Sequence, residues 1–448
     1  MNRKLWQGGR AFKAGIEPNK IMSEDDVVPD SYLIDYEILT LIAFQVELFG
    51  EGKIERKKSS AIINCLLEIR GKYDSIPTDY EDVHSFVQNI VDKKIGEDAE
   101  NLRILLSRNE EIHSDLRMFY RDHIISIQEG LYSLICSVKE MESKFEGTLP
   151  GYTHYRQAMP VSVKTYADFI ASVMENKIYE FQGILKDLST SPLGYGSGFG
   201  NLLDIDWENL AKSLGFNCSN SNPLFLASQR PIDDFNIMAA LTATMLDISR
   251  ISQDLIFLTS EELGIFTLPS DYVTGSSLMP NKMNPDFLEI VEGFASTFAG
   301  NLAAIASNTI NKLSGYHREF QIGKKLTIDS IMKAEKIIAA LSDMFLRISF
   351  DKERASKAIQ NSTYATNYAA EMVKSGNAWR DSYSEAGKKI ADSDKIPVSN
   401  VKSFVAIDKK RIDALKFLIE ENRRNVNESK ENLLREAEKC AAKIQETQ

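Results

Sequence analysis

The scarcity of proline limits the fold of this chain more than any other feature. Only 12 of its 448 residues are proline, against a usual share of about 5%. No proline occurs in 78–149 or in 286–396, so two long stretches lack the residue that interrupts helices. Apolar residues in 163–185 recur in steps of three and four, as in an amphipathic helix. Strand-like alternation is scarce, and the sequence therefore predicts an all-α protein with long helices.

Long helices in a soluble protein need partners along their apolar faces, and an oligomeric bundle supplies them more easily than a monomer. The longest uncharged stretch, Gly293 to Asn311, has 19 residues, of which seven are Ser, Thr or Asn. Such a stretch is too polar for a membrane span. We therefore expect no membrane partner and interpret this stretch as a helix buried among other helices.

Charge and cysteine content exclude several other classes of protein. The formal net charge is −11, which does not suit a nucleic-acid scaffold. Residues 1–12 lack the apolar run of a signal peptide, which favours a cytoplasmic protein. The cysteines lie far apart, without a CxxC pair, so neither a disulfide framework nor a structural zinc site is predicted. These four residues are Cys65, Cys136, Cys218 and Cys440.

The most informative segment for chemistry is Thr274 to Asp286, with the sequence TGSSLMPNKMNPD. Its glycine, serines and prolines predict a loop, in which Lys282 and Asn284 could surround a carboxylate. A serine here could act as a base if backbone N–H groups and the lysine held its developing charge. An ordinary turn before a helix that begins near Asp286 explains the same residues.

Three other segments carry candidate side chains. His154 follows Thr153 between two prolines, and histidine is the side chain most easily tuned as an acid or base near neutral pH. A structural or surface histidine is the alternative, and it is our interpretation of His113 and His123. Ser107 to Glu110 lies in a helical stretch and offers an arginine beside an amide. The residues Tyr316, Gln321 and Lys324 offer a phenol, an amide and an ammonium group, the last two on one helix face.

Two further segments have structural explanations. The stretch 192–201 contains four glycines, but it lacks the GxGxxG spacing and a preceding strand, so we interpret it as a tightly packed turn rather than a dinucleotide loop. The stretch 408–444 is dense in charge. It is predicted to be a solvated helix with a narrow apolar stripe.

Together these segments make the chain similar to the fumarase and aspartase superfamily, and within it to the argininosuccinate lyases. The mobile loop of that superfamily, Gly-Ser-Ser-x-Met-Pro-x-Lys-x-Asn-Pro, is matched by 275–285 at every fixed position. The resemblance to argininosuccinate lyases comes from Lys4 to Trp6, Ser107 to Asn109, Ser114 to Arg117, Pro150 to His154, Pro192 to Gly194, and Trp379 with Arg380.

The resemblance implies roles for individual residues. Ser276 would be the base, Lys282 and Asn284 would steady the carbanion, and His154 would serve on the acid side with Glu289 as its charge partner. No metal or organic cofactor is implied. The substrate-binding residues implied are Ser107, Arg108, Asn109, Thr153, Arg230, Ser277, Asn284, Tyr316, Gln321 and Lys324.

The resemblance also implies an activity, the cleavage of argininosuccinate to arginine and fumarate in arginine biosynthesis. The implied architecture has three helical domains, 1–106, 107–354 and 355–448, with the central one forming the bundle of a homotetramer. Its active sites would be shared, with the segments around Asn109, His154 and Ser276 meeting from different subunits.

Two alternatives to this activity stay open. One is another fumarate-releasing lyase, such as an adenylosuccinate lyase, and the other is a structural lyase-fold protein without activity. Several residues depart from the usual pattern and concern the amino-acid end of the substrate: Ile38 with Leu39, Arg103 with Ile104, Glu110, Arg156 with Gln157, Met283 and Gly323.

Overall fold

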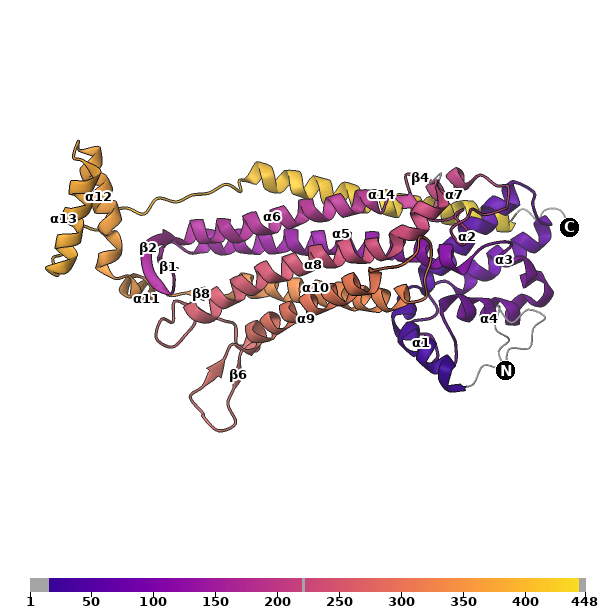
Figure 1. Ribbon diagram of the computed structural model, residues 1–448, viewed down its shortest axis with the longest axis horizontal. Coiled ribbons are helices and arrows are strands. Elements are labelled where there is room, and N and C mark those ends of the chain that lie inside the picture. The colour runs from indigo at the N-terminus through magenta and orange to yellow at the C-terminus, as the bar shows by residue number, and fades with distance from the viewer. Residues whose placement is uncertain (1–15, 220–221, 443–448) are drawn as a thin grey trace.

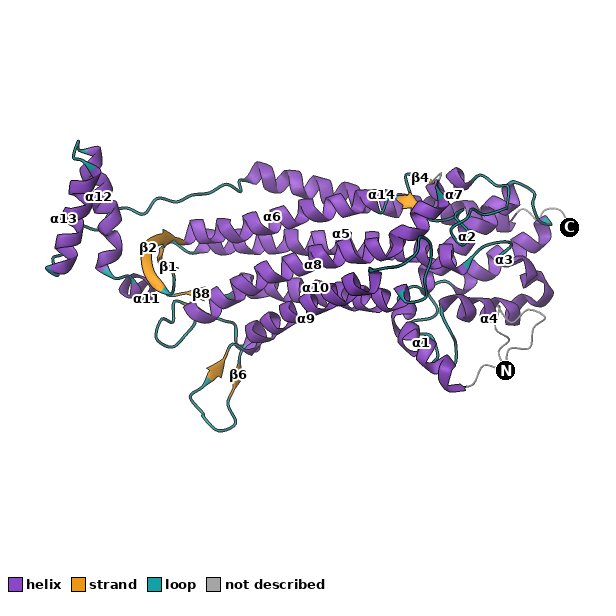
Figure 2. Ribbon diagram, viewed as in Figure 1, coloured by secondary structure: helices purple, strands orange, loops and turns teal. Residues whose placement is uncertain are grey.

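The computed structural model describes residues 16–219 and 222–442, and most of them are helical (Figures 1 and 2). This confirms the all-α prediction. Five long helices run side by side as the body of the molecule. The longest, α5, has 37 residues and spans about 55 Å at the helical rise of 1.5 Å per residue. The five are α5 (Arg108–Lys144), α6 (Val163–Asp187), α8 (Pro223–Leu258), α9 (Asp286–Thr309) and α10 (Phe320–Arg347).

Helix α6 shows how local sequence produces these elements. Its N-cap Ser162 accepts a hydrogen bond from the backbone N–H of Thr165 at 3.1 Å, which satisfies one of the free donors of the first turn. The predicted apolar positions then enter the core, where Ile170, Met174 and Phe181 are fully buried. The amphipathic helix predicted for 163–185 is therefore confirmed.

Shorter helices gather at the two ends of the bundle (Figure 1). The final helix, α14, returns along the bundle and contacts α2, α3 and α5. One end holds α1 (Ile16–Ser31), α2 (Ile34–Gly50), α3 (Arg56–Ile69), α4 (Val83–Ile95), the 3-10 helix Gly96–Asn101 and α7 (Trp207–Ser213); the other holds α11 (Lys352–Ala358), α12 (Ala365–Lys374) and α13 (Trp379–Ala391). Two further 3-10 helices, Ser270–Tyr272 and Asn361–Tyr364, and α14 (Lys409–Ala442) complete the helices of the described chain.

The C-terminal stretch forms the charged helix that the sequence predicts. Leu415, Ile419 and Leu433 of α14 are buried, whereas most of its charged residues are exposed. The last two residues of the predicted helix, 443 and 444, lie outside the described part of the chain, as do Lys4 to Trp6. The three domain boundaries stay a prediction.

Within the described residues, strands are short and pair only in twos. The sequence analysis missed the antiparallel hairpin of β1 (Thr148–Thr153) and β2 (Arg156–Ser162). Its strands contain Pro150 and Pro160, which suit only an edge position, and both strands of an isolated ribbon are edges. The other strands are β3 (Thr190–Ser191), β4 (Cys218–Ser219), β5 (Phe266–Thr267), β6 (Thr274–Gly275), β7 (Met283–Asn284) and β8 (Ser349–Phe350).

Within a single chain, helix α9 meets one expectation only in part. The uncharged stretch was expected to be buried among other helices, but α9 packs on α8 and α10 along one side only. In the uncharged stretch, Ala295, Phe298 and Ile305 are buried on that side, whereas Ala299, Ala303 and Ala304 are exposed. A single chain therefore leaves much of this helix uncovered. Among the described helices, none is both long and apolar enough to cross a membrane.

Candidate active site

The segment 274–286 forms a narrow hairpin that projects from the side of the bundle (Figure 1). Thr274 pairs with Asn284 and Gly275 with Met283. The Thr274 hydroxyl donates a hydrogen bond to the carboxylate of Asp286 in the first turn of α9. The predicted loop is thus present, closed at its base by two short strands.

The Ser276 hydroxyl lies just beyond this strand pair. Its Oγ accepts hydrogen bonds from the backbone N–H groups of Leu278 at 3.2 Å and Met279 at 3.0 Å. Two N–H dipoles aimed at one oxygen favour negative charge on it, which is the condition that a serine base requires. Ser277 and Lys282 are exposed on the same loop.

His154 lies at the tip of the β1–β2 hairpin. Because Thr153 pairs with Arg156, His154 and Tyr155 form a two-residue turn, and both have positive φ, at 52° and 56°. This backbone matches the twist of the flanking strands, and the imidazole is left exposed.

Beside this tip is a groove of about 860 Å³, which we call the His154 groove. Thr153 and His154 line it together with Arg250 and Asp254 of α8 and Glu292 of α9. Burial raises the pKa of Glu292, and the neighbouring Glu289 raises it further.

The predicted charge partner of the histidine, Glu289, is exposed one turn before Glu292 and is not among the residues that line the His154 groove. Its role therefore stays a prediction. The sequence analysis missed Glu292, although its three-residue spacing from Glu289 places both on neighbouring positions of one helix face.

A second cavity, of about 390 Å³, brings four predicted residues together at the other end of the bundle. We call it the Asn109 cavity. Arg108 and Asn109 come from the start of α5, Tyr316 precedes α10, and Gln321 lies in the first turn of α10. The full lining is Asp30, Glu81, Asp82, His84, Arg108, Asn109, Ile112, Tyr316, Arg318 and Gln321.

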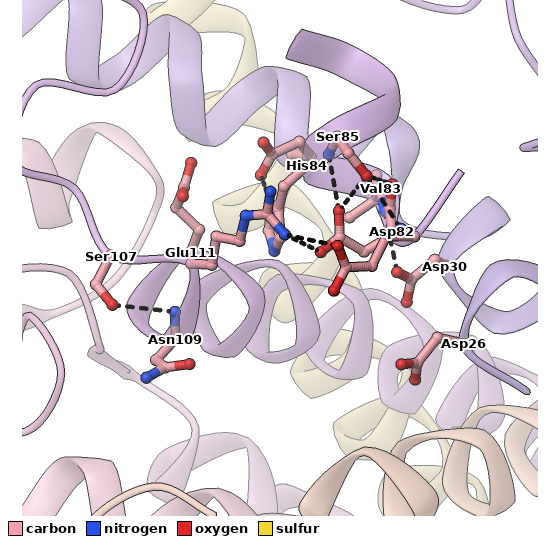
Figure 3. Close-up of polar contacts among 12 residues, drawn as sticks. Asp26, Asp30, Asp82, Val83, His84, Ser85, Ser107, Asn109 and Glu111 are labelled. Carbon is pink, nitrogen blue, oxygen red and sulfur yellow. Dashed lines mark hydrogen bonds and ion pairs between the residues drawn. The ribbon is translucent and has the colours of Figure 1, made fainter. Parts of the chain in front are cut away.

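The carboxylates of this cavity are fixed by local hydrogen bonds (Figure 3). Asp30 accepts from the N–H of Val83 at 3.0 Å. Asp82 caps α4 by accepting from the N–H of Ser85 at 2.8 Å, and it also accepts from Arg108 at 2.7 Å. Burial alone would raise the pKa of Asp82, but His84 and Arg108 outweigh that effect and lower it. Asp82 is therefore held as a carboxylate.

Two predicted substrate-binding residues lie behind the cavity wall. The buried Arg230 donates from Nη2 to Gln321 Oε1 at 2.5 Å, and its guanidinium carbon lies 5.4 Å from the centre of the Tyr316 ring. Lys324 is fully buried and is not among the lining residues. Its ammonium pairs with Asp26 at 3.0 Å and with Asp30. Direct substrate contact by either residue stays a prediction.

The sequence analysis overlooked the segment Glu81 to His84, which supplies three of the lining residues. A signal was present, because two acidic residues and a histidine stand at the start of a helix whose N-cap pattern is Asp82 with Ser85. Such caps are common, however, and this pattern alone does not separate a cap from a site.

One group among the described residues has the composition of a metal site. Glu37, His84 and Asp115 are all buried, and their ligand atoms lie within 4.8 Å of one another. Arg103, however, donates to Glu37, and it also donates to Glu111 at 2.8 Å. Its guanidinium therefore already supplies the positive charge. We therefore interpret this group as a buried ion-pair network and assign no metal to it.

The three predicted segments lie far apart within one chain (Figure 1). Asn109 is in the first turn of α5, whereas His154 follows the end of that helix, which is about 55 Å long from its 37 residues. Ser276 stands on the separate projecting hairpin. One chain therefore carries all the candidate groups without bringing them together.

Comparisons with known proteins agree with this architecture. Residues 16–300 match a family model described as "Lyase". An argininosuccinate lyase of Thermotoga neapolitana is 31% identical over 395 residues, which cover 87% of this chain and 98% of the relative.

Solved structures of superfamily members share the fold. An EDDS lyase variant with bound fumarate has a TM-score of 0.76 and 16% identity, covering 97% of this chain and 98% of its own. A class II fumarase from Schistosoma mansoni has a TM-score of 0.66 and 16% identity, covering 82% and 90%. The chain therefore belongs to the lyase family of the fumarase and aspartase superfamily, the family that includes the argininosuccinate lyases.

Proposed function

We propose that this protein is an argininosuccinate lyase, which cleaves argininosuccinate to arginine and fumarate. The observation that carries the proposal is the Ser276 hydroxyl, held by two backbone N–H donors within a loop that matches the mobile loop of the superfamily. Relatives with that printed name support the choice of substrate.

The reaction is a base-initiated elimination. Ser276, as its alkoxide, takes a proton from the substrate carbon next to a carboxylate, and the electron pair spreads onto that carboxylate. Lys282 and Asn284, on the same loop, stabilise this charge. The pair then forms the double bond of fumarate as the C–N bond breaks. The departing nitrogen receives a proton from the side of His154, because a poor nitrogen leaving group requires one.

The Asn109 cavity is proposed to hold the substrate while this occurs. Asn109, Tyr316 and Gln321 offer amide and phenol groups to a bound substrate. Asp82 is paired with Arg108 and Asp30 with Lys324, and Arg318 also lines the cavity. The argininosuccinate lyase relatives, rather than the charge of this cavity, therefore support argininosuccinate over a purine nucleotide.

The distances within one chain support a homotetramer whose active sites are shared between subunits. Separate chains would bring the Asn109 cavity, the His154 tip and the Ser276 hairpin together, and they would cover the exposed side of α9. Refolding the inactive variants His154→Asn and Ser276→Ala together should restore part of the activity, because some mixed sites carry neither lesion. An active monomer in sedimentation, or mixed tetramers without recovered activity, would refute sharing.

The activity itself is tested with purified protein and two substrates in parallel. Fumarate release, followed by absorbance, should be rapid with argininosuccinate and slow with adenylosuccinate, and arginine should appear in equal amount. Faster release from adenylosuccinate would overturn the assignment, and no release from either would favour a structural role. Residence in the cytoplasm is part of this proposal.

A further inference from the structure

The carboxylate of Glu110 joins the start of α5 to the glycine-rich turn 192–201, beside the Asn109 cavity. Its Oε2 accepts from the backbone N–H groups of Gly194 and Gly196, both at 2.8 Å. Its Oε1 accepts from the N–H of Ser107 at 2.9 Å and from the amide of Asn201 at 3.0 Å. Glu110 is fully buried, so this carboxylate is satisfied by the protein alone.

The glycine-rich turn is shaped to present those N–H groups. Gly194 and Gly196 have φ of 95° and 61°, values that side chains other than glycine rarely adopt. A Cβ on Gly196 would lie 2.8 Å from the carbonyl oxygen of Gly200, which is too close. The four glycines noted in the sequence thus serve a tight turn, as predicted, and this turn encloses a carboxylate.

Two further contacts from these segments hold the backbone of Asn109. Tyr195, from the turn, donates its hydroxyl hydrogen to the Asn109 carbonyl at 2.6 Å. The Asn109 N–H donates to Ser107 Oγ at 3.3 Å (Figure 3). Asn109 lines the cavity, and its side-chain amide has no hydrogen-bond partner among the described residues. Its backbone is fixed while its amide remains available.

We propose that Glu110 is a positioning residue, which locks the glycine-rich turn onto the start of α5 and so aims the Asn109 amide at the substrate. The inference rests on the proposed function only for the identity of that substrate. Glu110 does not touch the cavity, because it is not among the lining residues, and it acts through Asn109.

The variant Glu110→Gln tests the charge with almost no change of shape. Its NH₂ group must face either the two glycine N–H groups or the donors of Ser107 and Asn201, so donor opposes donor in both orientations. We expect KM to rise about tenfold or more, since hydrogen bonds to a charged group are among the strongest. The kcat should change by less than about twofold, because the lost interaction binds the substrate and the transition state equally well.

The control is Glu208→Gln. The carboxylate of Glu208 in α7 also joins two segments, because it accepts from the N–H and hydroxyl of Ser219 in β4 at 2.7 and 3.0 Å, although its side chain is 42% exposed. It does not line the Asn109 cavity. Its replacement should leave KM unchanged, so an equal rise in KM in both variants would reduce Glu110 to a general structural role and overturn the proposal.

A double-mutant cycle separates positioning from stability. Asn109→Ala should raise KM by itself, and Glu110→Gln added to it should raise KM by less than about twofold, because the group that it positions is already gone. Independent, multiplying effects would overturn the inference. Glu110→Asp, which keeps the charge on a shorter side chain, should recover part of the affinity and serves if Glu110→Gln folds poorly.

Crystal structures of the variants give a measurement that does not depend on the reaction. The Asn109 side chain should be displaced in Glu110→Gln and unchanged in Glu208→Gln. An unmoved Asn109 would overturn the positioning role whatever the substrate is. Failure of the wild-type protein to cleave argininosuccinate, with Asn109 displaced as expected, would overturn the proposed function alone.

Discussion

The variant Lys324→Met tests whether this lysine stabilises the fold. The resemblance implies that Lys324 binds substrate, whereas the structure buries its ammonium between Asp26 at 3.0 Å and Asp30. Burial lowers the pKa of Lys324, but the two carboxylates outweigh that effect and raise it. Methionine keeps most of the apolar stem and removes the charge. The variant therefore leaves the buried Asp30 without its ion-pair partner and Asp26 with only the half-exposed Arg318, at 3.8 Å.

The expected cost is large. Breaking a buried ion pair by removing one partner costs about 3–5 kcal/mol, which is a substantial part of the roughly 5–15 kcal/mol by which a domain is stable. Circular dichroism during urea unfolding, at one fixed protein concentration, measures the change. The midpoint should fall clearly below that of the wild type.

The neighbouring lysine is the control. Lys325 pairs with Asp329 at 2.8 Å on the surface, with side chains 36% and 48% exposed, and such pairs contribute about 0–1 kcal/mol. Lys325→Met should therefore shift the midpoint little. The triple variant Lys324→Met, Asp26→Asn, Asp30→Asn should regain much of the loss, because no buried charge remains there. Equal midpoints for Lys324→Met and Lys325→Met would refute the reasoning.

Three further predictions concern the loop 274–286 and pH. Ser276→Ala should lower turnover by about two to four orders of magnitude without changing the unfolding midpoint, and near-normal turnover would exclude this serine as the base. Fumarate should slow hydrogen exchange in 275–283 if the hairpin closes over substrate; equal exchange with and without it would contradict closure. Burial and the nearby Arg117 lower the pKa of His113 to about 4, so only the unfolded chain binds this proton between about pH 6.5 and 4. The free energy of unfolding should therefore fall by up to about 1.4 kcal/mol per pH unit as pH drops through that window, and an equally steep fall in His113→Gln would contradict this.

Local patterns were enough to predict the helices and part of the site. The periodicity of 163–185 predicts α6 because residues on the apolar face of a helix recur every three to four positions in the sequence. The Gly/Ser/Pro content of 274–286 predicts a loop for a similarly local reason. Asn109, Tyr316 and Gln321 were expected in one site from the resemblance, and the structure places all three on one cavity.

The sequence by itself thus determined that long helices dominate the fold, that 163–185 is one of them, and which residues are chemically able to act. Only the tertiary structure decided which of these residues meet. Lys324 contacts Asp30, which is 294 residues away in the sequence, and Glu110 contacts Gly196, which is 86 residues away. The sequence therefore predicted neither the burial of Lys324 nor the partners of Glu110. The physical reason is that periodicity tells which face of a helix is apolar but not which distant segment covers it, and a buried charge depends on that partner.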